Sequence, residues 1–340
     1  FKQKTAYEIR PRDWSSDVLL FRSCAAGVHA ATPNPPPEPI IDIHQHTHYH
    51  DRTDDQMLAH QRAMGVTTTI LLPAGRVSER PSTHNGKSNG LAARCGGNEN
   101  VRAFALAHPG EFLFGANEIT DLPEAKSEIE TYLKLGAKLI AEQKFGVQCD
   151  SAESERLYAL AADYGVPILL HFQEGTYNSG FQRLPAMLKK FPKTTFIMHA
   201  QTTWANIDAN YDWKSLYPTG PVAKGGLTSQ YLSDYANCFA DMSAGSGLNS
   251  LLRDEDHTRW FLEKHQDKIL YGSDCADTLG RGPGCQGAGT IAAIRCISCI
   301  SAMGGLRRMA ARRAAQLIAH RALEVRAHQT EVACVVEQKG

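Results

Sequence analysis

Short runs of apolar and β-branched residues recur along the chain, and several are separated by stretches in which apolar positions follow the helical period. A short apolar run bounded by turn residues is typical of a buried strand, and a 3.6-residue period is typical of an amphipathic helix. The runs predict eight strands, at residues 39–46, 67–73, 112–119, 138–145, 167–172, 194–200, 238–243 and 268–274. Clear helices are predicted at 53–65, 151–165 and 253–266.

The first two of these helices carry the signals of helix ends. Thr53 and Ser151 stand where a side-chain oxygen can accept a hydrogen bond from a free backbone N–H group. Gly65 and Gly165 stand at the other ends, where glycine adopts the left-handed conformation at low cost. Each helix is therefore bounded by residues that favour its start and its end.

Strands that alternate with helices predict a parallel sheet in one α/β domain. Eight strands over residues 39–295 fit a (β/α)8 TIM-like barrel, whose typical size is about 250 residues. A doubly wound open sheet is the alternative, but its glycine-rich phosphate loop should follow the first strand. Histidines stand at that place in this chain, so the barrel is favoured.

Residues of the types that bind metals stand where predicted strands end. His44 and His46 end the first strand, His171 the fifth, His199 the sixth and Asp274 the eighth. A barrel gathers these strand ends on one face, and side chains two apart on a strand point the same way. Each residue alone is more often structural than a ligand, but together they indicate a site for zinc or a similar divalent ion.

Other candidates concern the substrate. Arg76, just after the second strand, could grip a carboxylate or be a solvated loop residue, and Gln173 follows the histidine of the fifth strand. The long segment 201–231 carries Trp204 among several aromatic residues, which form either a lid over the site or a packed cluster. Residues 242–249 are small and predict a turn that lets substrate approach the backbone.

Composition and charge narrow the class of protein. The chain has 340 residues, of which 42% are hydrophobic and 21% are charged, as in a globular protein with a sizeable core. It contains no run of 18 apolar residues, which excludes a membrane-spanning helix, and its net charge of zero argues against nucleic-acid binding. Nine scattered cysteines form neither a zinc-finger pattern nor a disulfide framework. The expected partner is a small-molecule substrate, and homo-oligomer formation stays open.

Four segments, taken in order, carry a family resemblance: IDIHQH, ILLHFQ, IMHA and YGSDCAD. They resemble the motifs of the amidohydrolase superfamily, specifically its amidohydrolase-related (amidohydrolase 2) family, over residues 39–295. The resemblance implies a distorted TIM barrel with one or two divalent ions. It implies that His44, His46, His171 and Asp274 are metal ligands and that His199 lies beside the catalytic water.

On the fourth predicted strand, Glu142 and Lys144 are two residues apart and therefore share a face. The residues alone allow a buried ion pair that shapes the pocket. The resemblance adds that a glutamate or a carboxylated lysine at this strand can bridge two metal ions. We expect one ion, held by the histidines and Asp274, and leave a second ion open.

These parts predict the chemistry. A zinc-type ion lowers the pKa of bound water to about 7, Asp274 can accept its proton and pass it to the leaving group, and His199 can polarise the substrate oxygen. We predict a metal-dependent hydrolase that cleaves a C–N or C–O bond of a small amide, ester or lactone with zinc, or alternatively manganese. One alternative is a non-oxidative decarboxylase of the aminocarboxymuconate-semialdehyde decarboxylase type. A second is an inactive barrel fragment.

The ends of the chain differ from this body. Residues 2–18 match the in-frame translation of a sequencing-library adapter, so we expect 1–18 to be an artefact, with a poorly ordered N-terminus as the alternative. Residues 19–38 combine a small-residue signal-peptidase pattern with a proline-rich stretch, which predicts export to the periplasm or cell exterior, or else a linker in a cytoplasmic protein. Residues 296–340 lack the Asn-Ala motif of the family, which predicts a frame-shifted segment or a divergent helix.

Overall fold

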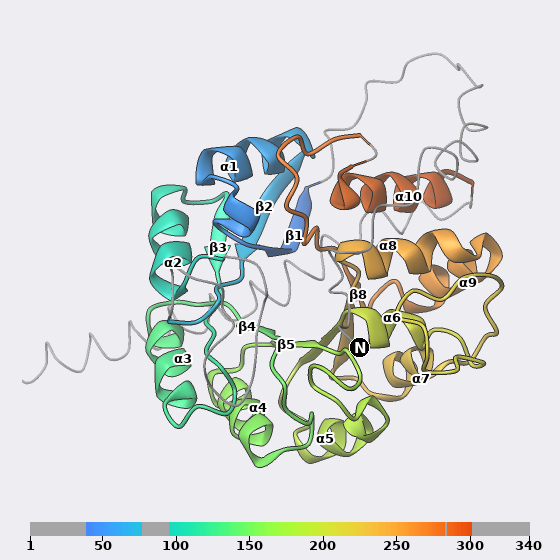
Figure 1. Ribbon diagram of the computed structural model, residues 1–340, viewed down its shortest axis with the longest axis horizontal. Helices are drawn as coiled ribbons and strands as arrows, with labels where there is room; N and C mark the ends of the chain where they lie inside the picture. Colours follow the sequence, from blue (N-terminus) through green and yellow to red (C-terminus); the bar gives the residue numbers. More distant parts are fainter. Residues whose placement is uncertain (1–38, 77–94, 283, 301–340) are drawn as a thin grey trace, which may run out of the picture.

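The predicted strands are all present in the computed structural model, which describes residues 39–76, 95–282 and 284–300 (Figure 1). All neighbouring strands pair in parallel, in a three-stranded sheet with the order β1-β2-β3 and a five-stranded sheet with the order β4-β5-β6-β7-β8. The strands are β1 (Ile40–Gln45), β2 (Val66–Leu71), β3 (Phe112–Phe114), β4 (Ile140–Gln143), β5 (Ile168–His171), β6 (Phe196–His199), β7 (Cys238–Asp241) and β8 (Ile269–Leu270). The predictions for residues 1–38 and 301–340 lie outside the described residues.

Backbone hydrogen bonds join the two sheets at both seams. Between β3 and β4, the N–H group of Ala116 donates to the carbonyl of Leu139 at 3.0 Å. Between β8 and β1, the N–H group of Ile43 donates to the carbonyl of Tyr271 at 3.1 Å, and that of Asp274 donates to His44 at 2.8 Å. The strands thus form a ring, which confirms the TIM-like barrel.

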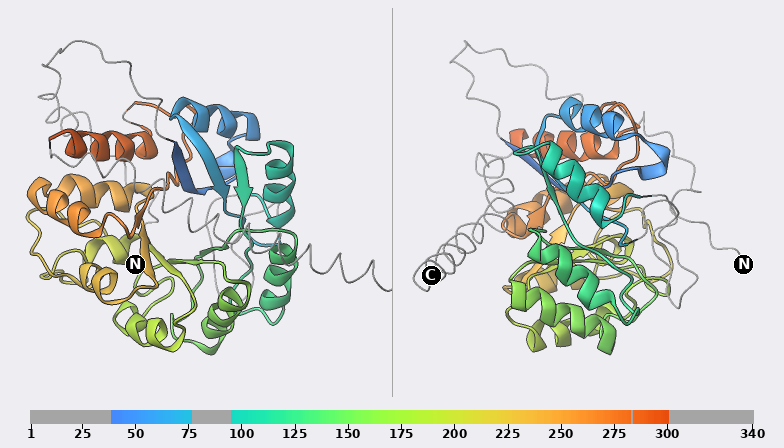
Figure 2. Two further views of the ribbon diagram at one scale, coloured as in Figure 1. Left: turned by 180° about the vertical axis from the view of Figure 1, so that it is seen from behind. Right: turned by 90° about the vertical axis from the view of Figure 1, so that its left-hand side faces the viewer.

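The helices surround the strands (Figures 1 and 2). They are α1 (Asp54–Ala63), α2 (Asn98–Ala107), α3 (Ala125–Lys134), α4 (Ala152–Tyr164), α5 (Leu184–Lys190), α6 (Gln201–Ala205), α7 (Leu227–Asp234), α8 (Ala244–Arg253), α9 (Glu255–His265) and α10 (Gln286–Ile300), with 3-10 turns η2 (Tyr49–Asp51) and η3 (Phe181–Arg183). The expected end signals operate: the hydroxyls of Thr53 and Ser151 accept backbone hydrogen bonds, and Gly165 is left-handed with φ 57°. Of the helices that the structure describes, none combines the length and apolar character needed to cross a bilayer.

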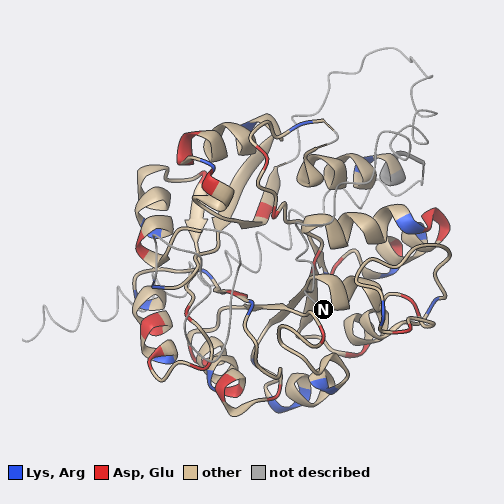
Figure 3. Ribbon diagram, viewed as in Figure 1, with Lys and Arg blue, Asp and Glu red and all other residues tan. Residues whose placement is uncertain are grey.

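Two apolar layers result from the alternation of side chains along the strands. On β5, Ile168 and Leu170 pack outward in the layer beneath the helices, whereas Leu169 packs inside the barrel. His171 continues the inner row at the end of the strand. Lys, Arg, Asp and Glu lie mainly on the outer helices and loops, with both signs interspersed (Figure 3). The fold therefore separates a charged exterior from an inner face that ends in ligand-type side chains.

Two connecting segments contain helices that the sequence did not predict. Residues 242–249 were predicted to be a turn open to substrate; residues 244–249 instead form the start of α8, so the predicted turn is wrong. The small residues serve close packing: a side chain at Gly247 would lie 2.4 Å from the carbonyl oxygen of Met242, and α8 packs against α10 (Figure 2). The segment 201–231, whose aromatic residues were predicted to form either a lid or a packed cluster, includes α6 and the start of α7.

Candidate metal centre

The two histidines of β1 are each held from behind by an acceptor. His44 Nδ1 donates to Asp241 Oδ2 at 2.7 Å, and His46 Nδ1 donates to the carbonyl oxygen of Leu72 at 2.8 Å. Since a carboxylate and a carbonyl oxygen accept hydrogen bonds, the proton of each ring belongs on Nδ1. The Nε2 atoms of both rings are left as electron-pair donors that face the mouth of the barrel.

Two carboxylates face these Nε2 atoms. Glu142 Oε2 lies 3.6 Å from His44 Nε2 and 3.7 Å from His46 Nε2. Asp274 Oδ1 lies 3.8 Å from His44 Nε2 and 3.6 Å from His46 Nε2. These separations exceed hydrogen-bond lengths and match the spacing of ligand atoms that share one ion at about 2.0–2.2 Å.

The histidines of β5 and β6 complete the ring of donors. His171 Nδ1 contacts Glu142 Oε1 at 2.6 Å. His199 Nε2 lies 3.8 Å from Glu142 Oε1 and 3.7 Å from Asp274 Oδ2, while its Nδ1 lies 3.1 Å from the hydroxyl of Ser243. Glu142 is thus shared between two donor groups, one on β1 and the other on β5 and β6.

Five buried polar atoms of this cluster have no hydrogen-bond partner within the described part of the chain. Leaving such an atom unpaired costs about 1–3 kcal/mol, and more when the group is charged, so five at one place require an explanation. Divalent cations bound by these donors would satisfy them, and imidazole and carboxylate atoms have the chemistry that such ions require. The atoms are His44 Nε2, His46 Nε2, His171 Nε2, Glu142 Oε2 and Asp274 Oδ1.

The mixture of charges shifts the pKa values of these groups. Burial raises the pKa of Asp274, but the neighbouring histidines outweigh it and lower the pKa to about 2. Burial lowers the pKa of His44, yet the carboxylates of Asp274 and Asp241 hold it well above its usual value, so an ion that binds His44 Nε2 competes with a proton there. Burial and the charge of Lys144 lower the pKa of His171 to about 3. At pH 7, Asp274 is therefore ionised and His171 is neutral, the forms that bind metals.

The backbone at Asp274 is in the left-handed region, with φ 40°. Aspartate tolerates this conformation better than most residues, but the conformation still costs energy. The neighbouring Gly272 allows the close approach of strands here, because a side chain on it would lie 2.6 Å from Asp241 Oδ1 and 2.7 Å from the Cβ of His44. The local chain is built to bring Asp274 to the mouth of the barrel.

The other predicted site residues lie as follows. Lys144 Nζ lies over the ring of Tyr177, 5.7 Å from its centroid. The guanidinium of Arg76 is 3.2 Å from Glu118 Oε2, so it already forms an ion pair with a buried carboxylate.

The last two predicted substrate residues lie elsewhere. Gln173 shares a tight backbone turn with Tyr177. The Trp204 ring is buried in the core beneath the helices. Its Nε1 atom donates to the carbonyl of β7's last residue at 2.9 Å.

The sequence prediction did not include Asp241. This buried carboxylate ends β7 and accepts hydrogen bonds from His44 Nδ1 and, at 2.8 Å, from the Ser243 hydroxyl. It also lies 3.3 Å from His199 Nδ1, so it supports two rings of the centre. The sequence could have indicated this aspartate, because it lies near the end of the predicted strand 238–243, and a position at a strand end was the criterion that identified Asp274.

A scan against protein-family models finds no match, and a sequence search of curated proteins finds none either. Solved structures do match. A 2,6-dihydroxybenzoate decarboxylase from Rhizobium has a TM-score of 0.51 at 15% identity, covering 83% of this chain and 98% of its own. An uncharacterised TIM-barrel protein from Bordetella bronchiseptica has a TM-score of 0.53 at 14% identity, with coverages of 83% and 98%. The chain shares their fold.

A third match is a probable 2-pyrone-4,6-dicarboxylic acid hydrolase from Acinetobacter baumannii. Its TM-score is 0.51 at 10% identity, and the match covers 82% of this chain and 99% of the hydrolase. The three structures confirm the TIM-like barrel. They include both a decarboxylase and a hydrolase, so the reaction has to be argued from the centre itself.

Proposed function

We propose that this chain is a metal-dependent hydrolase of the amidohydrolase type that cleaves a C–N or C–O bond in a small amide, ester or lactone. The observation that carries the proposal is the convergence of five unpaired, buried donor atoms at the strand ends. Imidazole and carboxylate donors of this kind suit zinc, with manganese as the alternative.

The position of Glu142 favours hydrolysis over decarboxylation. Its carboxylate belongs to one donor group with His44 and His46 and to another with His171 and His199. If each group held one ion, the pair would supply the two-metal chemistry that stabilises the attacking and leaving atoms of a hydrolysis. We therefore propose that Glu142 bridges two sites.

When bound, a zinc-type ion lowers the pKa of water to about 7 and polarises a substrate oxygen. Asp274, ionised because its pKa is about 2, accepts a proton from the nucleophile and returns it to the leaving atom. His199 Nε2 faces the same space; because Ser243 and Asp241 hold the ring proton on Nδ1 from behind, Nε2 offers a lone pair that accepts a hydrogen bond from the nucleophilic water.

The test is turnover of panels of esters, lactones, amides and aromatic acids by the chain loaded with zinc or manganese. The proposal predicts product carrying oxygen from isotopically labelled water. It also predicts that Asp274→Asn abolishes turnover while the circular dichroism spectrum is kept, and that Asp208→Asn, a buried aspartate paired with Arg253 away from the centre, retains turnover. Carbon dioxide release from an aromatic acid would assign the decarboxylase instead. No turnover of any panel by folded, loaded protein would contradict both.

A further inference from the structure

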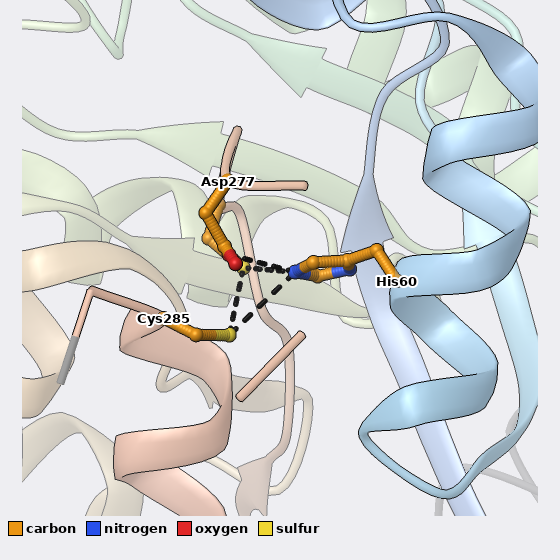
Figure 4. Close-up of side chains that lie close together, drawn as sticks. His60, Asp277 and Cys285 are labelled. Carbon is orange, nitrogen blue, oxygen red and sulfur yellow. Dashed lines mark hydrogen bonds and ion pairs between the residues drawn. The ribbon is translucent and has the colours of Figure 1, made fainter. Parts of the chain in front are cut away.

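A second group of metal-ligand side chains lies outside the proposed catalytic centre (Figure 4). His60 on α1 faces Asp277 in the loop after β8 and Cys285 just before α10, and Cys275 in the same loop completes the group. His60 and both cysteines are buried, and one donor atom from each of the four residues lies within 4.8 Å of the others. Nothing in the proposed reaction uses these side chains.

We propose that these four residues form a separate, structural zinc site. Two cysteines with a histidine and a carboxylate are a donor set that suits zinc in a closed tetrahedral site. The two Sγ atoms are 3.8 Å apart, and they lie 3.3 Å and 3.5 Å from His60 Nε2. Two sulfurs bound to one zinc at about 2.3 Å each, at the tetrahedral angle, are separated by about 3.8 Å.

The His60 ring is oriented for this role. Its Nδ1 donates to Gln61 Oε1 at 3.0 Å, and the Nε2 atom of Gln61 donates to Asp42 Oδ2 at 2.7 Å. Because Asp42 accepts, the amide of Gln61 must present its oxygen to His60, which places the ring proton on Nδ1. Nε2 of His60 lies 2.8 Å from Asp277 Oδ1, at hydrogen-bond distance, and faces the two sulfurs, so a zinc ion here takes the place of the proton between the ring and the carboxylate.

The site ties together three segments that position Asp274. Cys275 is the next residue along the chain, α1 supplies His60, and Cys285 precedes the helix that packs on α8. Arg52 reinforces the same loop by donating to the carbonyl oxygens of Cys275 and Asp277 at 2.9 Å and 3.0 Å. A zinc ion here fixes the loop that follows the strained backbone of Asp274, and its role is to hold that carboxylate in place.

A disulfide between Cys275 and Cys285 is the competing arrangement for these thiols. The distance of 3.8 Å between the sulfurs is well beyond the bond length of about 2.05 Å, so a disulfide requires movement of the loop. The two arrangements differ in what they do to the thiols: zinc displaces their protons and keeps both sulfurs reduced, whereas a disulfide removes both from a thiol count.

The experiment uses Co²⁺ as the probe, added to reduced full-length chain after removal of metal. Cobalt bound by thiolates gives intense sulfur-to-cobalt charge-transfer absorption in the near ultraviolet, and the imidazole and carboxylate donors of the catalytic centre give none. We expect the band in the wild-type chain and its loss in Cys275→Ala and Cys285→Ala, with bound cobalt reduced by about one ion per chain. Cys238→Ala, which changes a buried cysteine on β7, is the matched control and keeps the band.

A double variant separates this proposal from the proposed function. His44→Ala with His46→Ala empties the catalytic centre of cobalt and leaves the charge-transfer band unchanged. The proposal is overturned if the reduced wild-type chain shows no band at saturating cobalt, if the band persists without Cys275 and Cys285, or if peptide mapping finds these two residues joined in a disulfide. The wild-type spectrum decides even where a cysteine variant fails to fold.

Discussion

Replacing Asp241 by asparagine tests whether a buried carboxylate behind the metal ligands is needed for metal binding. Asp241 Oδ2 accepts from His44 Nδ1 at 2.7 Å and from the hydroxyl of Ser243 at 2.8 Å, while Oδ1 accepts from the N–H group of Ser243 at 3.0 Å. Both carboxylate oxygens therefore accept hydrogen bonds. An asparagine has only one side-chain oxygen, so in either orientation its NH₂ group faces at least one of these hydrogen-bond donors.

The Asp241→Asn substitution weakens metal binding mainly through its effect on His44. If the amide nitrogen faces His44, it donates a hydrogen bond to Nδ1, so the ring proton must move from Nδ1 to Nε2. The protonated Nε2 then no longer offers an electron pair to an ion. Removing a supporting partner of a metal-bound histidine costs about 10–100-fold in metal affinity, or roughly 1.4–2.7 kcal/mol. The loss of a second support to His199, 3.3 Å away, favours the upper part of this range.

The assay is competition for Zn²⁺ between the protein and a chromophoric chelator, with circular dichroism to verify the fold. Asp208→Asn is the matched control, because Asp208 is also a buried aspartate but pairs with Arg253 at 2.6 Å, away from the centre. We expect Asp241→Asn to bind zinc more weakly than the wild-type protein and Asp208→Asn to bind it equally well. Equal zinc affinity in folded Asp241→Asn and wild-type protein would refute the proposed role of this carboxylate.

Three further predictions concern other parts of the structure. Glu142→Gln removes the carboxylate that two donor groups share, and we expect it to lower zinc affinity by more than the about 10–100-fold cost of a supporting residue, in the same competition assay. Gly272→Ala places a Cβ atom 2.6 Å from Asp241 Oδ1, and we expect it to reduce the free energy of unfolding by about 1–3 kcal/mol in denaturant titration, whereas unchanged stability would show that the strands can separate here at no cost. Burial lowers the pKa of His265 in α9 from 6.5 to about 4, so between these values the unfolded chain binds a proton that the folded chain does not, and stability falls as pH falls. His265→Gln should flatten the dependence of unfolding free energy on pH in this window, and equal slopes for wild type and His265→Gln would contradict the assignment.

The eight strands and the barrel were predictable because the periodicity of apolar residues distinguishes strands from helices, and the order of these elements along the chain indicates the fold. Each strand is an apolar run bounded by turn residues, and parallel strands bring their carboxyl ends to one face. This rule placed His171 and His199 correctly at the mouth of the barrel, since both continue the inner row of their strands.

The direction of Glu142 was not predictable from strict alternation. Leu139 and Ala141 pack inside the barrel, so alternation would turn Glu142 outward. The pairing shifts instead: Ile140 is opposite Ile168, but Gln143 is opposite Leu170, so β4 has an extra residue between these pairs. Such a bulge turns a side chain to the other face.

The first strand contains the same kind of bulge. Asp42 pairs with Thr69, and Gln45 pairs with Leu71, which leaves an extra residue on β1. Ile43 packs inside the barrel, and the adjacent His44 still reaches the centre. A sequence pattern gives the residue types at a strand end, but backbone pairing decides which of them meet.

Long-range packing explains the remaining differences. The small residues of 242–249 suit either a turn or a helix packed closely on its neighbours, and α8 packs against α6, α9 and α10. His60 is 215 residues from Cys275 in the sequence, so its meeting with Cys275, Asp277 and Cys285 depends on how α1 docks beside the loop after β8.

The most direct test of the central claim is anomalous X-ray diffraction, at the zinc absorption edge, from crystals of zinc-loaded protein. The account predicts an anomalous peak within coordination distance of His44 Nε2, His46 Nε2 and Asp274 Oδ1, with Glu142 beside it. A fully loaded crystal with no anomalous density at these atoms would contradict the account, even if zinc were found elsewhere in the chain.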